Sequence, residues 1–311
     1  MLYQGDAEKW LKLAYGLKAR YTMHLLKRSA NKDADMEKVL EYVNNSFESA
    51  EEQAAFDVYD ANNINPLYGF FVARAGLGAS ESMRSKLAEY NDPRLSRAFI
   101  TKQGTSGKEQ APGTADNAVY APNGTPEQGT SKYGTSLFMY SISAPTLLLS
   151  YHELKFLEAE ALCRLERDAK SALKDAVVAG LLNAENSFTI SRKELGKTLI
   201  NAASSITEAE AESYFDNTIE AKYTAEPLKT TMTQKYFALW GASGEATESY
   251  NDVRRMKGLG ENFIELKNPN SFPLRCPYGN SDTTTNAEVK AAYGNGQYVY
   301  SENVWWAGGS R

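Results

Sequence analysis

The spacing of hydrophobic and polar positions along the chain predicts a mainly helical protein. In several long segments, apolar side chains recur at intervals of three and four residues, with charged residues between them. The predicted helices cover residues 6–29, 35–55, 146–166, 168–183, 207–222 and 226–256, the last broken around 241–244. No segment alternates apolar and polar residues long enough to indicate an extensive sheet. We therefore expect strands to be a minor component.

Two of these segments have recognisable helix starts. The helix at 6–29 begins after Asp6, a suitable N-cap, and its apolar stripe includes Trp10, which we expect to be buried. The helix at 146–166 contains Ser150 and Glu153 at capping-box spacing, and its two apolar stripes predict burial on two sides. Small residues in the next helix allow close packing, so the two are similar to a tetratricopeptide unit, although no period of about 34 residues repeats.

The periodic pattern stops between residues 102 and 136. This segment is rich in Gly, Pro, Thr, Ser and Asn, and we expect a long loop there. Loops of more than about 15 residues without structure of their own are usually functional or disordered, so both a ligand-facing loop and a floppy insertion stay open. The tail from residue 257 onward is also expected to be irregular.

Composition and charge exclude several classes of function. The formal net charge of −5 gives no general attraction to nucleic acid or to anionic lipid. No apolar run approaches the roughly 20 residues that span a bilayer. Two cysteines, Cys163 and Cys276, leave one disulfide open, and the two histidines provide little for a metal site, so we expect neither metal nor cofactor.

Catalytic motifs are not found in the sequence. The glycines and lysine at 104–108 lack the spacing of a phosphate-binding loop. Three glutamates at positions 153, 158 and 160 lie on one predicted helix, which favours ion pairs over the opposed acid and base of a glycosidase. Arg255 can pair with Asp252 at the i, i+3 spacing, which indicates a structural role. We therefore predict no catalytic residues.

Four stretches, in chain order, are similar to one known family. They are residues 5–10 (GDAEKW) with 17–20 (LKAR); Pro145 with 151–161 (YHELKFLEAEA); 234–240 (QKYFALW) with 250–255 (YNDVRR); and Arg275, Tyr278, Asp282 and Asn286. Together they resemble the SusD/RagB-like outer-membrane nutrient-binding lipoproteins, in the second, starch-binding-associated branch.

This resemblance implies a mainly α fold, with tetratricopeptide-like helix pairs under long irregular loops, and no catalysis. It further implies a protein at the cell surface, anchored in the outer membrane by a lipid, that covers a TonB-dependent transporter and holds a glycan or other nutrient. The lipid-bearing cysteine and the N-terminal helical region of the family have no counterpart in this sequence. We therefore expect one domain over 1–311 that corresponds to the C-terminal part of a family member.

Tyrosine is the residue type that suggests a binding surface. The chain has 19 Tyr against 12 Phe and 4 Trp, and a tyrosine ring offers both a flat apolar face and a polar tip. We predict that Tyr68, Tyr120 and Tyr133 lie exposed on polar loops and stack on sugar rings, with Asn65 and Asn123 as hydroxyl partners. The alternative is that these rings pack the loops onto the helices.

Three functions are compatible with these observations. The first is a non-enzymatic glycan or nutrient binder of an outer-membrane uptake complex. The second is a helical-repeat scaffold that binds a protein or peptide on a concave surface, with Tyr serving only in packing. The third is a carbohydrate hydrolase, which turnover of a bound sugar would reveal.

Overall fold

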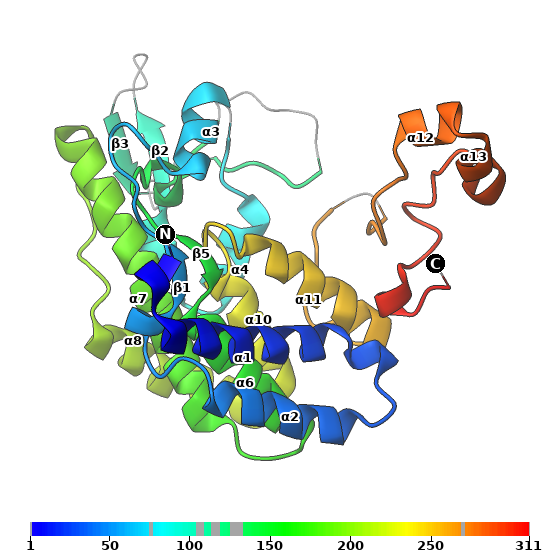
Figure 1. Cartoon of the computed structure of the whole chain (residues 1–311). Coiled ribbons are helices and arrows are strands. Elements are labelled where there is room, and N and C mark those ends of the chain that lie inside the picture. Colours follow the sequence, from blue (N-terminus) through cyan, green and yellow to red (C-terminus); the bar gives the residue numbers. More distant parts are fainter. Residues whose placement is uncertain are drawn as a thin grey trace.

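A computed structural model of the chain describes residues 2–74, 77–103, 109–112, 119–124, 133–268 and 271–310 (Figure 1). The fold is mainly helical, as the sequence predicts. The longer helices are α1 (Ala7–His24), α2 (Lys32–Asn44), α6 (Tyr151–Arg164), α7 (Lys170–Leu195), α10 (Pro227–Ala238) and α11 (Ala246–Leu259). The shorter ones are α3 (Pro66–Arg74), α4 (Glu81–Glu89), α5 (Leu95–Ala98), α8 (Glu208–Tyr214), α9 (Glu220–Ala225), α12 (Asn280–Thr285) and α13 (Ala287–Tyr293).

Two small antiparallel sheets connect the helices. In the first, β1 (Ala54–Phe56) pairs with β5 (Thr146–Leu149). In the second, β2 (Phe99–Gln103) lies between β3 (Glu109–Pro112) and β4 (Thr135–Ser136). Much of the second sheet falls inside the segment 102–136, so the prediction of a plain loop is wrong at residues 102–103, 109–112 and 135–136. The described residues 119–124 and 133–134 lie in no helix or named strand. Residues 104–108, 113–118 and 125–132 of that segment lie outside the described residues.

Several helix boundaries differ from the predicted ones. The segment 146–166 begins with strand β5, because β1 provides a pairing partner and the helix starts only after its N-cap at Ser150. There the Glu153 N–H donates to Ser150 Oγ at 3.1 Å, so the predicted cap is confirmed. Helix α2 ends at Asn44, before the predicted residue 55, and α7 continues to Leu195, well past the predicted residue 183. The break near 241–244 is confirmed between α10 and α11.

Helix α6 is buried on two sides, as its two stripes predict. Leu154 and Leu157 pack into a hydrophobic cluster with α1, α2 and β5. Phe156 and Ala159 pack into a second, larger cluster with α7, α10 and the β2 region. In Figure 1 the helix lies behind α1 and α2, within the body of the molecule. It therefore joins these two hydrophobic clusters.

The predicted burial of Trp10 is wrong. Its side chain is 45% exposed and makes an edge-to-face contact with Tyr3, with ring centroids 5.7 Å apart. The buried face of α1 instead contains Leu13, Gly16 and Arg20, among others. The prediction fails because the face of α1 that packs against the core includes Gly16 and Arg20, which are not part of the apolar stripe.

Buried ion pairs link four helices at the centre of the molecule. Arg20 of α1 donates to Glu153 of α6, with Nε to Oε1 at 3.0 Å. Arg255 of α11 donates to Glu160 of α6 and to Asp252, at 2.8 and 2.7 Å. Lys235 of α10 completes the network at 2.8 Å from Asp252. The structural roles predicted for Glu153, Glu160 and Arg255 are therefore confirmed.

The network is built from the residues that carry the family resemblance. The residues concerned are Arg20, Glu153, Glu160, Lys235 and Arg255, and each lies within one of the stretches that carry the resemblance. Each is almost fully buried, and a buried charge is tolerated only when it is paired and hydrogen-bonded. The stretches that resemble the family therefore contain the residues whose buried ion pairs hold the helices together.

Candidate functional site

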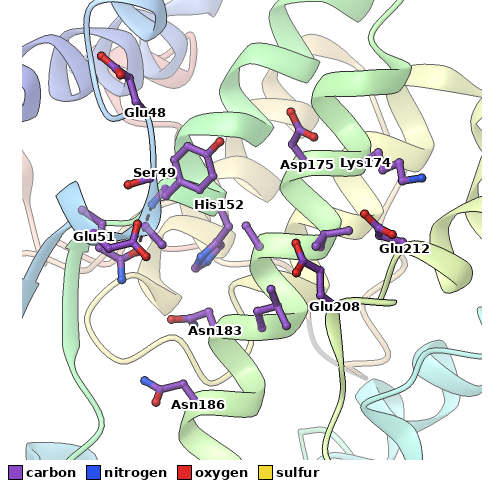
Figure 2. A pocket seen from close by; sticks show the side chains of 16 residues that line it. Glu48, Ser49, Glu51, His152, Lys174, Asp175, Asn183, Asn186, Glu208 and Glu212 are labelled. Atoms are coloured by element: carbon purple, nitrogen blue, oxygen red, sulfur yellow. Dashed lines mark hydrogen bonds between the residues drawn. The ribbon is translucent and has the colours of Figure 1, made fainter. Parts of the chain in front are cut away.

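The candidate site for binding a small molecule is a pocket of about 540 Å³ beside α6 and α7 (Figure 2). We call it the α6–α7 pocket. Its wall is formed by the turn at residues 48–53, the first turn of α6, one face of α7 and the start of α8. The lining residues are Glu48, Ser49, Ala50, Glu51, Gln53, Tyr151, His152, Lys174, Asp175, Val178, Ala179, Leu182, Asn183, Asn186, Glu208 and Glu212.

An aromatic ring and an apolar strip form part of the lining. Tyr151 is the first residue of α6, and its position is fixed because its N–H donates to Gln53 Oε1 at 3.2 Å. Its half-buried ring leaves part of its surface open, and burial raises the pKa of its hydroxyl, which therefore stays protonated. Val178 and Leu182 lie one turn apart on α7 and supply aliphatic surface beside it.

Two amides continue the same face of α7. Asn183 and Asn186 are three residues apart, so their side chains are neighbours on the helix surface. Within the described part of the chain, neither amide has a hydrogen-bond partner. An amide both donates and accepts hydrogen bonds, which suits a ligand with several hydroxyl groups.

His152 lies deep in the pocket wall. It is 1% exposed, and in Figure 2 its ring extends from α6 toward Asn183. Its Nε2 is 4.0 Å from Oε2 of Glu245, and neither atom has a hydrogen-bond partner among the described residues. Burial lowers the pKa of His152 to about 4, so the imidazole is neutral near pH 7.

Behind His152, two carboxyl groups share one arginine. Glu245 Oε1 accepts hydrogen bonds from the Ser150 N–H at 2.5 Å and from Arg20 at 3.1 Å. Burial and the neighbouring Glu153 carboxylate raise the pKa of Glu245. The arginine and other cations outweigh burial at Glu153, whose pKa is lowered. This pair belongs to the buried network and lies outside the lining of the pocket.

Carboxylates dominate the rim of the pocket. Asp175 is 3.4 Å from Lys155, and Lys174 is paired with Asp216 at 2.8 Å. Glu51 lies on the 48–53 turn, whereas Glu208 and Glu212 project from α8 on the other side of the pocket (Figure 2). Among the described residues, no group of three or more His, Cys, Asp or Glu side chains has the arrangement of a metal site.

The structure contradicts the predicted exposure of Tyr120 and Tyr133. Both side chains are 4% exposed. Tyr120 packs edge-to-face against Phe99, with centroids 5.2 Å apart, so the ring serves the core beneath β2. The alternative, in which the rings pack the loop onto the helices, is correct for Tyr120, which belongs to the hydrophobic cluster shared with α7 and α10. Tyr120 and Tyr133 are both buried. They cannot be open stacking platforms in this conformation.

Asn65 is also buried, at 1% exposure. Its Oδ1 accepts from the Leu67 N–H at 2.8 Å, and its Nδ2 donates to the Ala144 carbonyl at 2.7 Å. The side chain therefore fixes the start of α3 and ties it to the segment before β5. Both ends of the Asn65 amide are therefore used in hydrogen bonds within the protein, which leaves the side chain unsuited to bind a ligand hydroxyl.

Tyr68 and Asn123 are half-buried and lie in two different places. The Tyr68 hydroxyl donates to Glu194 at 3.2 Å, near the end of α7. Asn123 accepts from Ser80 Oγ at 2.8 Å and lines a second pocket of about 500 Å³ between α4 and α10, the α4–α10 pocket. The structure thus does not bring the five predicted residues together, and ligand contact by Tyr68 or Asn123 stays a prediction.

The residues of the α6–α7 pocket could have been found in part from the sequence. Asn183 is the last residue of the predicted helix 168–183 and Asn186 lies beyond its end, so the sequence does not predict their common face. Tyr151 directly follows the predicted N-cap at Ser150, so among the pocket residues its position at the start of α6 is the one that the sequence predicts best. The sequence pattern predicts a helix over the turn at 48–53, so the approach of this turn to α6 is not evident from the sequence.

Comparisons with known proteins identify the family. A family profile described as SusD-like, "Starch-binding associating with outer membrane", matches residues 1–278. A SusD/RagB family protein of Bacteroides thetaiotaomicron is 66% identical, with a TM-score of 0.94, and the alignment covers 100% of this chain. This chain spans 66% of the length of that protein.

More distant structures share the fold. A chitin-binding protein aligns with a TM-score of 0.69 at 19% identity, over 98% of this chain and 66% of the other. A SusD homologue of Bacteroides fragilis aligns with a TM-score of 0.70 at 19% identity, over 96% of this chain and 67% of the other. No curated protein matches the chain significantly. In the described residues, none of the helices has an apolar stretch that could traverse a bilayer. The family match and the 66% identity place this chain in the SusD/RagB family.

Proposed function

We propose that this chain binds a glycan in the α6–α7 pocket without cleaving it. It does so as part of an outer-membrane protein that delivers the ligand to a TonB-dependent transporter. The observation that carries the proposal is the combination, in one pocket of about 540 Å³, of Tyr151, an aliphatic strip and two amides that have no hydrogen-bond partner among the described residues.

The chemistry of a sugar explains why this combination is suitable. A sugar ring has an apolar C–H face and a rim of hydroxyl groups, so it needs a flat ring or aliphatic surface together with polar groups. Tyr151 and the side chains of Val178 and Leu182 provide the first. Asn183, Asn186 and the rim carboxylates provide the second. The pocket volume is within the range of about 300 to 1,000 Å³ that is usual for small-molecule sites.

Family membership supports the same class of ligand. The family is described as starch-binding and associated with the outer membrane, and one protein with the same fold is named as chitin-binding. Because this chain spans 66% of the length of its 66%-identical relative, the activity and location of the whole protein are proposed by analogy.

The ionisation, hydrogen bonding and placement of the acidic side chains favour binding without cleavage. Glu153 and Glu160 accept hydrogen bonds from Arg20 and Arg255, which keeps both carboxylates ionised and occupied. The pocket acids Glu208 and Glu212 come from one short helix, whereas a glycosidase needs an acid and a base opposed across the bond. Incubation of bound oligosaccharide with the protein, followed by chromatography, should return it intact.

A glycan array followed by calorimetry on the best ligand tests the binding site. Tyr151→Ala, and separately Asn183→Ala with Asn186→Ala, should each weaken binding by about 1 to 3 kcal/mol. Tyr300→Ala is the matched control, since this ring is 60% exposed and lies outside the pocket. Unchanged affinity in both pocket variants would place the ligand elsewhere, with Tyr68 and the α4–α10 pocket as the next sites to test.

Association with the transporter requires a separate experiment. The protein that contains this chain should co-purify in stoichiometric amount with one TonB-dependent transporter after extraction of the outer membrane with mild detergent. Protease added to intact cells should degrade it if it lies on the cell surface. Absence of a transporter from the purified complex would contradict this part of the proposal.

A further inference from the structure

A second pocket adjoins the α6–α7 pocket at the 48–53 turn. It has a volume of about 510 Å³, and we call it the β1 pocket. Its wall consists of residues 2–4, Lys9, part of the 48–53 turn, residues 55–58 and Pro145. The N-terminal turn at Leu2–Gly5 packs against β1, which brings residues 2–4 to this place (Figure 1).

The two pockets share part of their wall. Ala50, Glu51 and Gln53 line both of them. In Figure 2, Glu48, Ser49 and Glu51 lie along one side of the α6–α7 pocket, and the chain continues from this turn into β1. Among the shared residues, Ala50 is exposed and has only a methyl side chain, so it presents little obstruction. A chain-like ligand can therefore pass from one pocket to the other along the surface.

The lining of the β1 pocket combines the same kinds of surface as the α6–α7 pocket. Tyr3 and Phe56 contribute aromatic rings, and Val58 contributes aliphatic surface. Phe56 is 42% exposed and Val58 is 60% exposed, although both are apolar. The side chains of Gln4 and Asp57 have no hydrogen-bond or ion-pair partner among the described residues. Flat apolar surface beside such polar groups suits a sugar ring and its rim of hydroxyl groups.

Contacts within the protein hold both aromatic rings in place. The Tyr3 hydroxyl donates to the Glu52 carbonyl at 2.8 Å, and burial, together with the Glu52 carboxylate, raises the pKa of Tyr3 to about 12. Phe56 packs edge-to-face against Tyr59, with ring centroids 5.0 Å apart. The Tyr59 hydroxyl is hydrogen-bonded to Thr146 Oγ1 of β5 at 2.8 Å. A ring that is already fixed loses little conformational freedom when a ligand stacks on it.

From this arrangement we infer that the β1 pocket is a second subsite for the glycan held in the α6–α7 pocket, and that the preferred ligand is an oligosaccharide long enough to cross the 48–53 turn. The inference rests on the proposed function and specifies the length of its ligand. Each pocket alone has the usual size of a small-molecule site, so a ligand that occupies both is longer than one that occupies either. The lining of the β1 pocket carries both signs of charge, at Lys9 and at Glu51 and Asp57, which favours a neutral chain.

Contacts in the second pocket add affinity because the two parts of the ligand are covalently joined. Once one end is bound, the other end meets the β1 pocket at a high effective concentration, and most of the translational and rotational cost of binding has been met. Stacking on a fixed ring, with aliphatic surface beside it, should then increase affinity about tenfold. A disaccharide lacks this gain because it reaches only one pocket.

Oligosaccharides of two lengths provide the test. Calorimetry compares a disaccharide with a hexasaccharide in two neutral series, one derived from starch and one from chitin, and in the series of the best ligand on the glycan array if that is a third. We expect the hexasaccharide of a series that binds to have about tenfold higher affinity than the disaccharide. A longer homopolymer also has more registers in which to bind, so variants of the β1 pocket must show that this pocket is the cause.

The variant Phe56→Ala with Val58→Ala removes the exposed apolar surface of the β1 pocket and changes no residue that lines the α6–α7 pocket. It should lower hexasaccharide affinity about tenfold and leave disaccharide affinity unchanged. The matched control is Tyr300→Ala with Val72→Ala, since these side chains are 60% and 57% exposed and line neither pocket. Thermal melting of both variants checks that the fold is intact.

A second variant tests the same pocket without altering its apolar packing. Gln4→Ala with Asp57→Ala removes two exposed polar side chains that also lie outside the α6–α7 pocket. It should lower hexasaccharide affinity about three- to tenfold, because two hydrogen bonds to sugar hydroxyl groups are lost. Disaccharide affinity should again stay unchanged.

The outcomes distinguish this inference from the proposed function. Equal affinities for the two lengths, or a hexasaccharide preference that both β1-pocket variants retain, would overturn the inference and leave the proposed function standing. Equal losses for disaccharide and hexasaccharide in these variants would also overturn it, because the shorter ligand does not use a second subsite. Unchanged hexasaccharide affinity with loss of the transporter from the purified complex would assign Phe56 and Val58 to a protein interface instead. Failure of every glycan on the array and of both series to bind would overturn both proposals.

Discussion

Arg255 shows how strongly a single buried charge can matter. Its guanidinium is 1% exposed and contacts both Glu160 and Asp252. Arg255→Ala should lower the free energy of unfolding by about 3 to 5 kcal/mol, because the buried carboxylates of Glu160 and Asp252 each lose one of their two cationic partners and keep only Arg164 and Lys235. Urea denaturation measures this loss.

An exposed pair provides the control for Arg255. Arg167 pairs with Glu37, and both side chains are about half exposed. Arg167→Ala should therefore cost less than about 1 kcal/mol. If the two arginine variants lost similar stability, the buried network would not be the main link between α6 and α11.

His152 should make stability depend on pH. Its pKa is lowered to about 4 by burial, with Arg94 and Lys235 adding to the effect of burial and Glu153 opposing it. The unfolded imidazole takes up a proton near pH 6.5, whereas the folded one stays neutral down to about pH 4. Its contribution is therefore complete above pH 6.5 and falls by about 3 kcal/mol between pH 6.5 and 4.

The variant His152→Gln isolates this effect. The variant has no imidazole to protonate, so its free energy of unfolding should fall less steeply with decreasing pH than that of the parent chain. Other groups, including Glu245 with its raised pKa, contribute to both curves. Parallel curves for variant and parent between pH 7 and 4.5 would contradict the assignment.

At the residue scale, the sequence was a better guide to charged positions than to aromatic ones. The spacing of Asp252 and Arg255 was enough to predict their pairing, which the structure has at 2.7 Å. The exposure of Trp10, Tyr120 and Tyr133 was misjudged each time. Aromatic rings occur both in cores and on surfaces, and only the packing of distant elements decides between them.

Close approach of elements can be tested at Gly16. Helix α1 passes so near to β5 and to the turn after α2 that a Cβ added at Gly16 would collide with Leu149 and lie 2.8 Å from Ser46 Oγ. Gly16→Ala should therefore destabilise the protein by about 1 to 3 kcal/mol, although alanine is the better helix former by about 1 kcal/mol. Urea denaturation gives the size and sign.

Gly69 in α3 is the matching control. A Cβ there would approach only the flexible end of Ile64, at 3.2 Å. Gly69→Ala should leave stability unchanged or raise it slightly, since the helix-propensity gain is not opposed by overpacking. A stabilised Gly16→Ala variant would mean that α1 can move away from β5 without loss.

At the element scale, local signals located helices but not their ends. Ser150 fixed the start of α6 because its cap is a local interaction. The strand before it was missed because β5 exists only through pairing with β1, which is about 90 residues away in sequence. The α6–α7 pocket was missed for the same reason, since four separate elements form its wall.

At the scale of the whole molecule, α6 makes the two hydrophobic clusters interdependent. Leu157 packs with α1 and α2, whereas Phe156, its neighbour in sequence, packs with α7 and α10. If α6 moved away from one cluster, the other cluster would be exposed to solvent as well. The buried ion pairs reinforce the link, since Glu153 bonds to α1 and Glu160 to α11.

We therefore expect the helices of these two clusters to unfold in one cooperative transition. Hydrogen exchange followed by mass spectrometry should give the most protected amides of α2 and α10 the same free energy of opening, although these helices lie in different clusters. Leu157→Ala should lower both values together by about 2 to 5 kcal/mol, because the cavity it creates is in the shared helix. If α2 lost protection while α10 kept it, the clusters would be separate folding units, and α6 would belong energetically to only one of them.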